Sequence, residues 1–213
     1  LVEFRQKSGG AEAVFAATDS YRLAESVLDL PGQNVENRRL IIPAKTLSEV
    51  NRVLSVFKDS VEAPSTVSMG ISENQLVFSY GSVELISRTI EGNYPDYQQI
   101  IPQQFQTKAT VDRDDFTKAV KTASLFSRTG LFDVTLGFVP AEKRLEVKSV
   151  DADRGENSAS CTAEVDGGQN NVTLNYRYLL DGLSAVGTDQ VQFHMIDAGN
   201  PMKAMRWWWK VLA

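Results

Sequence analysis

The sequence predicts an α+β fold of two related domains, each with antiparallel sheets on one side and helices packed against the other. Three observations carry this prediction. Much of the chain alternates between apolar and polar residues with a period of two, three segments have helical periodicity, and the two halves share one order of elements. Turn-like clusters such as KSGGAE, SENQ and YGS separate neighbouring strand-like segments, which favours antiparallel pairing.

The strand-like segments of the first half are short and rich in β-branched and aromatic residues. They are LVEF, AVFAA, TVSMGI, QLVFSY and VELISRTI. Alternation along a strand places one set of side chains on a buried face and the other set toward solvent. These segments are therefore predicted to form a meander of antiparallel strands.

Three segments are predicted to be helices, at 43–58, 112–128 and 175–186. Asp112 is a favourable N-cap for the second helix, and Asn175 can cap the third. In each helix the apolar residues recur on one face, which we expect to meet the core. These residues are Leu47, Val50, Leu54 and Phe57, then Phe116, Ala119, Val120 and Ala123, and finally Tyr176, Leu179, Leu180 and Leu183.

A shift of 132 residues superposes the two halves: VEFRQ meets VTLGF, AVFAATDSYR meets LEVKSVDADR, and IIPAKTLSEV meets TLNYRYLLDG. Asp19 then falls on Asp151 and Arg22 on Arg154. The helix that precedes the second copy has no counterpart before the first. We expect one domain at 1–104, truncated at its N-terminus and ending in a linker at about 93–104, and a second at 105–213 with an atypical end from about 203.

Composition and charge argue against several classes of function. A net charge of −5 argues against a wholly basic nucleic-acid binder but leaves room for a local basic surface. One histidine, His194, and one cysteine, Cys161, cannot build a His-rich zinc site, and we interpret both as strand residues. GxGxxG, GxxxxGK[ST] and GxSxG do not occur. We therefore expect no enzyme activity, no metal and no cofactor.

The closest approach to a metal-binding loop is Asp151-Ala152-Asp153, which Arg154 follows at once, so a solvated turn is the better interpretation. The lone cysteine excludes an internal disulfide and fits a reducing cytoplasm. No secretory signal peptide and no apolar run of membrane-spanning length is present, so we expect a cytoplasmic protein without a membrane partner. The chain does not begin with Met, which is consistent with a missing N-terminal portion.

Four blocks resemble the bacterial DNA polymerase III beta sliding-clamp family. They are ATDSYRLAE, IIPAKTLSEV, ELISRTIEGNYPDYQQIIP, and NYRYLLDGLSAV followed by a strand and a DAGNP turn. Their order and spacing also match, over about residues 1–202. The resemblance corresponds to most of the family's middle domain and most of its last domain, while the family's first domain is absent.

The resemblance implies a DNA-clamp architecture and a function. Domains of this family join into a closed ring around duplex DNA, with helices lining the hole and sheets outside. The ring is normally a homodimer of two three-domain subunits, so self-association here would require the missing domain. Such a clamp is a processivity factor, which tethers the replicative polymerase to DNA and does no chemistry itself. The alternative is a peptide-binding fragment that cannot close a ring.

A sliding tether needs positive charge facing phosphate, without contacts that read bases. Cations on the helix faces opposite the apolar stripes are the candidates, and the resemblance places those helices at the hole. An equally simple interpretation is that they are solvated helix faces. The predicted DNA-facing residues are Lys45, Arg52, Lys118, Lys121, Arg128 and Arg177.

The resemblance also implies a hydrophobic pocket, between the two domains, in which partners dock short linear peptides. Partners of this kind are the DNA polymerase III alpha subunit, the clamp loader and other replication and repair proteins. By residues alone, the first wall could be a simple hairpin corner. The residues that match the pocket walls are Thr18, Ser20, Tyr21, Arg22, Leu23, Pro95, Gln99, Ile100, Asn200 and Pro201.

The end of the chain departs from the family pattern. The family ends in an apolar strand and a Met-Pro-plus-basic segment, whereas this chain ends in KAMRWWWKVLA. Consecutive tryptophans among cations suit either an interface with lipid or stacking on nucleic acid. The alternative is a replacement strand. Under either interpretation, the last wall of the predicted pocket departs from the family pattern.

Overall fold

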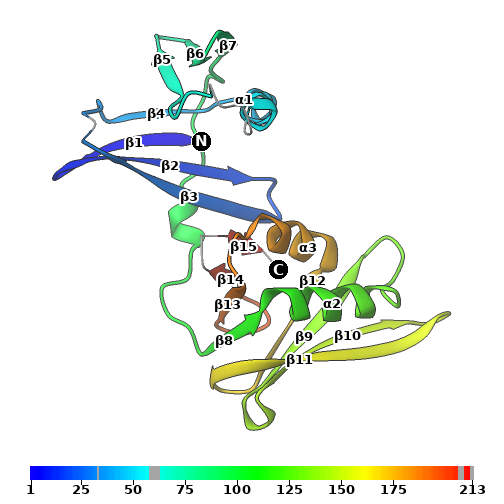
Figure 1. Cartoon of the computed structure of the whole chain (residues 1–213). Helices are drawn as coiled ribbons and strands as arrows, with labels where there is room; N and C mark the ends of the chain where they lie inside the picture. Colours follow the sequence, from blue (N-terminus) through cyan, green and yellow to red (C-terminus); the bar gives the residue numbers. More distant parts are fainter. Residues whose placement is uncertain (33, 58–62, 206–208, 212–213) are drawn as a thin grey trace. The chain divides into compact units, whose positions relative to one another are not determined.

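A computed structural model describes residues 1–32, 34–57, 63–205 and 209–211. The chain divides into two compact units, and each consists of two pieces of sequence (Figure 1). Leu1–Phe15 and Leu28–Pro95 form the first unit; Ala16–Val27 and Asp96–Ala213 form the second. The hairpin tip that holds the predicted corner therefore belongs with the C-terminal half of the chain.

The first unit combines a β-meander, one helix and a separate three-stranded sheet. Val2, Leu40, Ile42, Leu76 and Phe78 form its buried core, against which α1 packs Leu47 and Val50. Strand neighbours run β2-β1-β4 in one sheet and β5-β6-β7 in the other. The elements are β1 (Val2–Lys7), β2 (Gly10–Thr18), β3 (Arg22–Pro31), β4 (Arg38–Leu40), α1 (Ala44–Phe57), β5 (Ser68–Ile71), β6 (Gln75–Tyr80) and β7 (Val83–Arg88).

The second unit is an antiparallel sheet in the order β12-β9-β10-β11-β8-β13-β14-β15, continued by the tip of β3. α2 contacts β8, β9, β10 and β11 and also packs against α3, so both helices lie on one face of these strands (Figure 1). The elements are η1 (Tyr97–Ile100), β8 (Thr107–Asp112), α2 (Arg113–Ser124), β9 (Asp133–Val139), η2 (Pro140–Glu142), β10 (Arg144–Asp151), β11 (Gly155–Gly167), β12 (Asn170–Asn175), α3 (Tyr176–Ala185), β13 (Gln190–Met195), β14 (Met202–Met205) and β15 (Trp209–Val211).

The predicted caps of α2 and α3 are confirmed. Asp112 accepts a hydrogen bond of 2.9 Å from the backbone N–H of Asp115, and Asn175 accepts one of 2.9 Å from that of Arg177. Each bond satisfies a backbone donor that a helix start leaves without a partner inside the helix. The predicted stripe of α2 is buried in full: Phe116, Ala119, Val120 and Ala123.

The prediction that α2 continues to residue 128 is wrong. The helix ends at Ser124, and Leu125, Phe126 and Ser127 donate backbone hydrogen bonds to residues three positions earlier. This tighter winding ends the helix. Arg128 therefore lies beyond the helix, where its guanidinium pairs with Asp133 at the start of β9.

The internal repeat is visible in the strand order. Strands β4-β1-β2-β3 of the first copy follow the same neighbour order as β12-β9-β10-β11 of the second. In the second unit β8 lies between β11 and β13 and carries α2 behind it. Among the described strands of the first unit, none occupies the equivalent place beside β5.

Cys161 and His194 are strand residues, as expected. Cys161 is 9% exposed in β11 and belongs to the core of the second unit. His194 in β13 packs edge-on against Phe105, with ring centroids 5.0 Å apart. Burial, together with Lys108 and Lys203, lowers the pKa of His194, and its Nδ1 has no hydrogen-bond partner in the described structure. Both observations favour a neutral imidazole.

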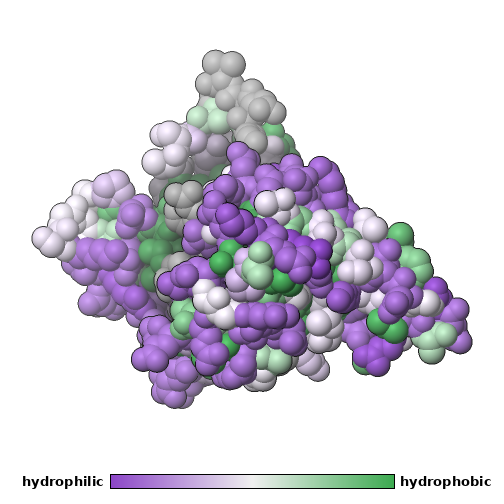
Figure 2. Space-filling model, turned by 90° about the horizontal axis from the view of Figure 1, so that it is seen from below, coloured by the Kyte–Doolittle hydropathy of each residue, from purple (hydrophilic) through white to green (hydrophobic). Residues whose placement is uncertain are grey.

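Figure 2 shows hydrophilic and hydrophobic residues interspersed on the face in view. Scattered apolar residues of this kind are normal on a protein surface. Among the described residues, no helix combines the length and the apolar character that crossing a bilayer requires.

The cap of α2 can be tested by replacing Asp112 with Ala. We expect Asp112→Ala to lower the free energy of unfolding by about 1 kcal/mol, because the N–H of Asp115 loses its acceptor. Urea unfolding followed by circular dichroism measures the change. Glu164→Ala, at an exposed position of β11, is the control and should stay within about 0.5 kcal/mol of the parent. Equal losses in both variants would contradict the capping role.

Burial, with smaller effects of Asp115 and Asp112, raises the pKa of the Cys161 thiol to about 11. Because the thiolate is the reactive species, iodoacetamide at pH 8 should alkylate the folded chain at least about tenfold more slowly than the urea-unfolded chain. Mass spectrometry of quenched samples measures both rates. A folded-state rate equal to the unfolded-state rate would show that Cys161 is accessible and ionised.

Candidate functional site at the hairpin corner

The corner between β2 and β3 is a turn held by its own side chains. Asp19 Oδ1 accepts hydrogen bonds from the backbone N–H groups of Tyr21 (3.1 Å) and Arg22 (3.0 Å). Thr18 Oγ1 donates to the carbonyl of Arg22 at 2.8 Å. Ser20 has a φ of 75°, in the left-handed region that such turns use. This local network explains why the sequence bends here.

Arg22 extends the turn through its side chain. Its Nε donates to Asp19 Oδ2 at 2.9 Å. Partial burial raises the pKa of Asp19, but the hydrogen bonds from the Arg22 side chain and from the backbone of Arg22 and Tyr21 outweigh that effect, so the pKa lies below its ordinary value. The carboxylate is therefore the stable form at neutral pH.

Helix α3 contacts the corner from 159 residues away in the sequence. Arg22 Nη1 donates to Asp181 Oδ2 at 2.6 Å. The guanidinium carbon of Arg22 lies 4.6 Å from the ring centroid of Tyr178, within the range of a cation–π interaction. The Tyr21 and Tyr178 ring centroids are 6.2 Å apart at an interplanar angle of 31°. The corner and α3 thus form one aromatic and charged cluster.

The linker turn η1 reaches the same strand. The Tyr97 hydroxyl donates to Glu25 Oε2 in β3, and the Tyr97 side chain is almost fully buried. This contact anchors η1, which carries the predicted residues Gln99 and Ile100. Gln99 Nε2 donates to Asp96 at 2.9 Å, and Ile100 is 46% exposed.

The last predicted wall is connected through the sheet. Asn200 Nδ2 donates to Asp197 Oδ1 at 2.9 Å, and β14 begins two residues later. β14 pairs with β15, and β15 pairs with β3 with Lys210 opposite Leu23. Part of the unusual tail thus forms a replacement strand, while residues 206–208 and 212–213 lie outside the described structure.

The predicted pocket residues differ in accessibility. Tyr21 is 64% exposed, whereas Leu23, predicted to offer apolar surface to a partner, is only 3% exposed. Tyr21 precedes β3 and lies in the turn, whereas Leu23 is inside β3, where it is opposite Lys210 of β15. Thr18 and Ser20 are exposed, and Asn200 and Pro201 are partly buried. Pro95 is the last residue of the other compact unit.

The second copy of the repeat serves as an internal comparison. Asp151 accepts hydrogen bonds of 3.0 Å from the backbone of Asp153 and Arg154, as Asp19 does in the first copy. The Arg154 side chain, however, donates to Thr129 Oγ1 at 3.2 Å. The turn therefore belongs to the fold of both copies, and the contacts with α3 distinguish the first.

Sequence reasoning missed Tyr178 and Asp181 as members of the cluster. Tyr178 is an aromatic residue next to, and outside, the apolar stripe of its helix, which is a signal that could have identified it. The shift of 132 residues aligns Asp181 with Glu49, and this alignment does not indicate a contact with Arg22.

The six predicted DNA-facing residues are all exposed. Arg52 pairs with Glu49 at 2.5 Å, Lys118 with Asp115 at 3.0 Å, and Arg128 with Asp133. The guanidinium of Arg177 lies over the Phe132 ring, 3.5 Å from its centroid. Lys45 and Lys121 have no ion pair among the described residues. Acidic neighbours thus offset part of this positive charge.

Lys121 borders a groove of about 380 Å³ between α2 and α3. Arg113 lines the same groove and donates from Nη1 to the carbonyl of Val186 at 2.8 Å, which ties the start of α2 to the end of α3. Asp114 and Asp181 lie on the groove as well. The two helices therefore present cations and carboxylates together.

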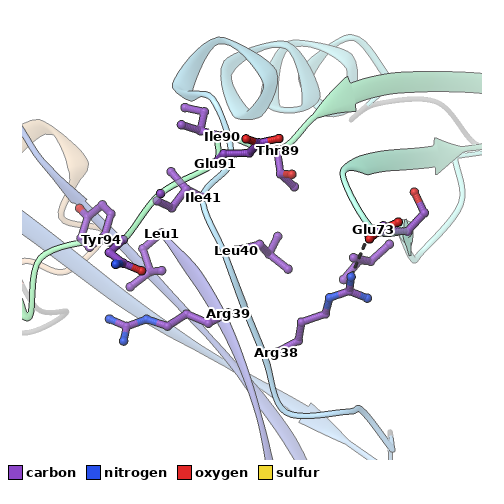
Figure 3. Close-up of a pocket in the computed structure, with 14 residues that line it drawn as sticks. Leu1, Arg38, Arg39, Leu40, Ile41, Glu73, Thr89, Ile90, Glu91 and Tyr94 are labelled. Atoms are coloured by element: carbon purple, nitrogen blue, oxygen red, sulfur yellow. Dashed lines mark hydrogen bonds between the residues drawn. The ribbon is translucent and has the colours of Figure 1, made fainter.

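A larger cavity, of about 620 Å³, lies in the first unit (Figure 3). Arg38 is directed toward the loop of Glu73 and donates to the carbonyl of Ser72 at 2.8 Å, whereas Arg39 projects away from that loop (Figure 3). The residues that line this cavity include these cations, carboxylates such as that of Glu91, and apolar side chains. Such a mixture favours no single class of ligand. Among the described residues, no cluster of three or more His, Cys, Asp or Glu side chains could hold a metal ion.

Solved structures of related proteins share this fold. A DNA polymerase sliding clamp from Bacillus subtilis superposes with a TM-score of 0.86 at 26% identity, over 99% of this chain and 55% of that chain. A sliding clamp from Bartonella birtlesii bound to griselimycin gives a TM-score of 0.84 at 28% identity, over 99% of this chain and 56% of that chain.

Sequence comparisons agree. The beta sliding clamp of Staphylococcus epidermidis is 31% identical over 191 residues, which are 89% of this chain and 48% of the relative. The chain thus spans about half the length of the curated relatives it matches. Residues 2–96 match the central domain of the DNA polymerase III beta subunit, and residues 98–205 match its C-terminal domain. The chain therefore belongs to the DNA polymerase III beta subunit family, the bacterial sliding clamps.

Proposed function

We propose that this chain is the central and C-terminal part of a processivity factor that tethers a polymerase to duplex DNA and does no chemistry itself. Membership of the sliding-clamp family supports the tether. The cluster at the hairpin corner is the observation that supports a docking function. There Tyr21 is 64% exposed and lies beside Arg22 and Tyr178. An exposed aromatic group held by rigid neighbours is a typical anchor for a partner's peptide.

The proposed partners dock through short linear peptides with apolar and aromatic anchors. They comprise the DNA polymerase III alpha subunit, the clamp loader and other replication and repair proteins. Within the second unit, the proposed binding surface includes the corner residues together with Gln99, Ile100, Asn200 and Pro201. A clamp from Bartonella birtlesii has been crystallised bound to griselimycin, so a relative of this chain holds a ligand. Closure of a homodimeric ring requires the segment that the longer relatives have and that this sequence does not contain.

Duplex DNA is the second proposed partner, bound without sequence preference. Lys45 and Lys121 supply charge that no described acidic side chain pairs, and exposed pairs such as Lys118–Asp115 can exchange for phosphate. The net charge of −5 leaves most of the remaining surface unfavourable for DNA. Binding of this kind holds the duplex weakly enough for it to slide.

Peptide docking can be tested at Tyr21, because Leu23 is buried and its replacement would disturb the fold. A fluorescein-labelled peptide with spaced Gln, Leu and Phe anchors should bind the parent chain. Tyr21→Ser should weaken that binding by about tenfold, since truncation of a central aromatic anchor costs on the order of 1–2 kcal/mol. Fluorescence polarisation measures the dissociation constants.

Val150→Ser is the matched control, because Val150 is a similarly exposed apolar residue (60%) of the same unit, in β10. It should bind the peptide as the parent does. Equal affinity of the parent and Tyr21→Ser would refute the assignment of the corner as a docking surface.

DNA binding can be tested by reversing charges on α2. The double variant Lys118→Glu with Lys121→Glu should bind duplex DNA more weakly and lower the slope of log affinity against log salt by about 2, because two phosphate contacts are lost. Lys108→Glu with Lys148→Glu, which changes the net charge equally on the strands β8 and β10, is the control.

Equal losses in the two double variants would show a general charge effect and contradict the helix-face assignment. A chain that binds the peptide but shows no salt-dependent DNA binding would correspond to the alternative function, a peptide-binding fragment that cannot encircle DNA.

A further inference from the structure

We propose that Phe105 and His194 form a pH-sensitive latch, which holds residues 102–105, between η1 and β8, against the sheet of the second unit. While the imidazole is neutral, Phe105 packs on His194. Protonation of His194 releases the segment. The latch goes beyond the functions proposed above and depends on neither peptide docking nor DNA binding.

His194 lies on the face of β13 that is turned away from the helices. Its neighbour Phe193 is fully buried and meets Phe116 of α2, and successive side chains of a strand point to opposite faces. The Phe105 ring packs on this outer face, with its centroid 5.0 Å from that of the His194 imidazole. Phe105 itself belongs to no helix or strand. The contact therefore joins the sheet to a connecting segment.

Two lysines flank His194 on the same face. The ladders of β13 place Lys108 of β8 and Lys203 of β14 directly opposite His194. Lys203 is only 7% exposed, and its Nζ lies 5.9 Å from the centroid of the Phe105 ring. Glu25 of β3 acts on Lys203 and offsets part of its charge. An imidazolium at His194 would be a third cation in this row, and water would screen it poorly from Lys203.

The imidazole also lacks a hydrogen-bond acceptor for a second proton. His194 Nδ1 is buried and has no hydrogen-bond partner within the described structure. Because an imidazolium carries N–H groups on both nitrogens, protonation leaves a buried donor unsatisfied whichever tautomer is present before it. Burial, together with Lys108 and Lys203, accordingly lowers the pKa of His194. Release of Phe105 admits water to Nδ1 and to Lys203 and reduces both costs.

The connecting segment, rather than the strand, is the part that can move. The backbone of His194 is held between two ladders, whereas no hydrogen bond joins the backbone of residues 102–105 to the sheet in the part of the chain that the structure describes. Both ends of the segment have their own anchors. The backbone N–H of Gln106 donates to a carbonyl of β13 at 2.9 Å, and the Tyr97 hydroxyl of η1 donates to Glu25. Protonation should therefore release residues 102–105 and leave η1 and β8 in place.

The direction of the pH dependence follows from the lowered pKa. The unfolded chain binds a proton at His194 near the ordinary pKa of about 6.5, and the latched state binds it only at lower pH. The latch is therefore intact above about pH 6.5 and is lost as the pH falls through the pKa of His194. His194 is the only histidine of the sequence, so a titrating imidazole resonance can be assigned to it directly.

A nitroxide spin label at position 104 can report the release, because Gln104 is exposed and adjacent to Phe105. Gln104→Cys is labelled in a Cys161→Ala background, and electron paramagnetic resonance spectra are recorded from pH 7.5 to pH 4.5. We expect the mobile fraction to rise at least about threefold, with a midpoint that coincides with the His194 titration measured by proton NMR. A label at Glu164→Cys, on β11, is the control and should keep its mobility.

Three kinds of variant make the result specific. His194→Gln and His194→Leu cannot titrate, and a variant that matches the parent spectrum at pH 7.5 should still match that spectrum at pH 4.5. Phe105→Ala should be mobile at every pH and gives the spectrum of the released segment. Lys203→Met, which removes the charge and keeps an unbranched side chain, should raise the NMR midpoint and lower the mobile fraction at acidic pH.

The parent and Lys203→Met test the latch even if both replacements of His194 disturb the packing. A label at position 104 whose mobility does not change with pH overturns the proposal. An acid-induced rise that persists in a His194 replacement also overturns it, as does a Lys203→Met variant that titrates and moves as the parent does. Equal rises at positions 104 and 164, with loss of the circular dichroism signal, would show general acid unfolding and overturn the local latch.

Discussion

The burial of one face of α2 and α3 against the antiparallel sheet is the constraint on which the candidate site depends. Phe116 of α2 is fully buried and meets Phe193 of β13 edge-on, with centroids 5.0 Å apart. α3 packs against α2 and buries its own Leu179 and Leu183 in the same core, which sets the rotation of α3 about its axis. Leu179 and Leu183 must then face inward, which turns Tyr178 and Asp181 toward the hairpin corner. A charged contact at the surface is therefore set by apolar packing in the interior.

The corner is held by local contacts within the turn and by long-range contacts with other elements. Its bend is local, since Asp19 accepts hydrogen bonds from the backbone N–H groups of Tyr21 and Arg22, and the same bend recurs at Asp151. Its contacts are long-range, since Arg22 reaches α3 and Glu25 of the same strand receives the Tyr97 hydroxyl. The two copies share the local contacts and differ in the long-range ones. The same turn can thus serve the fold of both copies while its arginine side chain has different partners in each.

Local patterns predicted most of the fold and part of the site. The three helices followed from periodicity and from caps that act within one turn, so Asp112 and Asn175 could be identified from neighbouring residues alone. The predicted end of α2, at residue 128, is too late. The backbone tightens after Ser124, and no capping residue in the sequence marks that point. The burial of Leu23 and the contact between Arg22 and Asp181 depend on strand register and on residues 159 positions away. No local pattern contains that information.

The sheet of the first unit has one further consequence. Among the described residues β5 hydrogen-bonds to β6 alone, and the position that β8 takes in the other unit has no described strand. In general, an edge strand presents a row of backbone donors and acceptors on its outer side. Natural proteins usually protect such edges, because unprotected ones recruit strands from neighbouring molecules. β5 has only four residues, and the shortness of an edge strand is one of the features that limit such pairing.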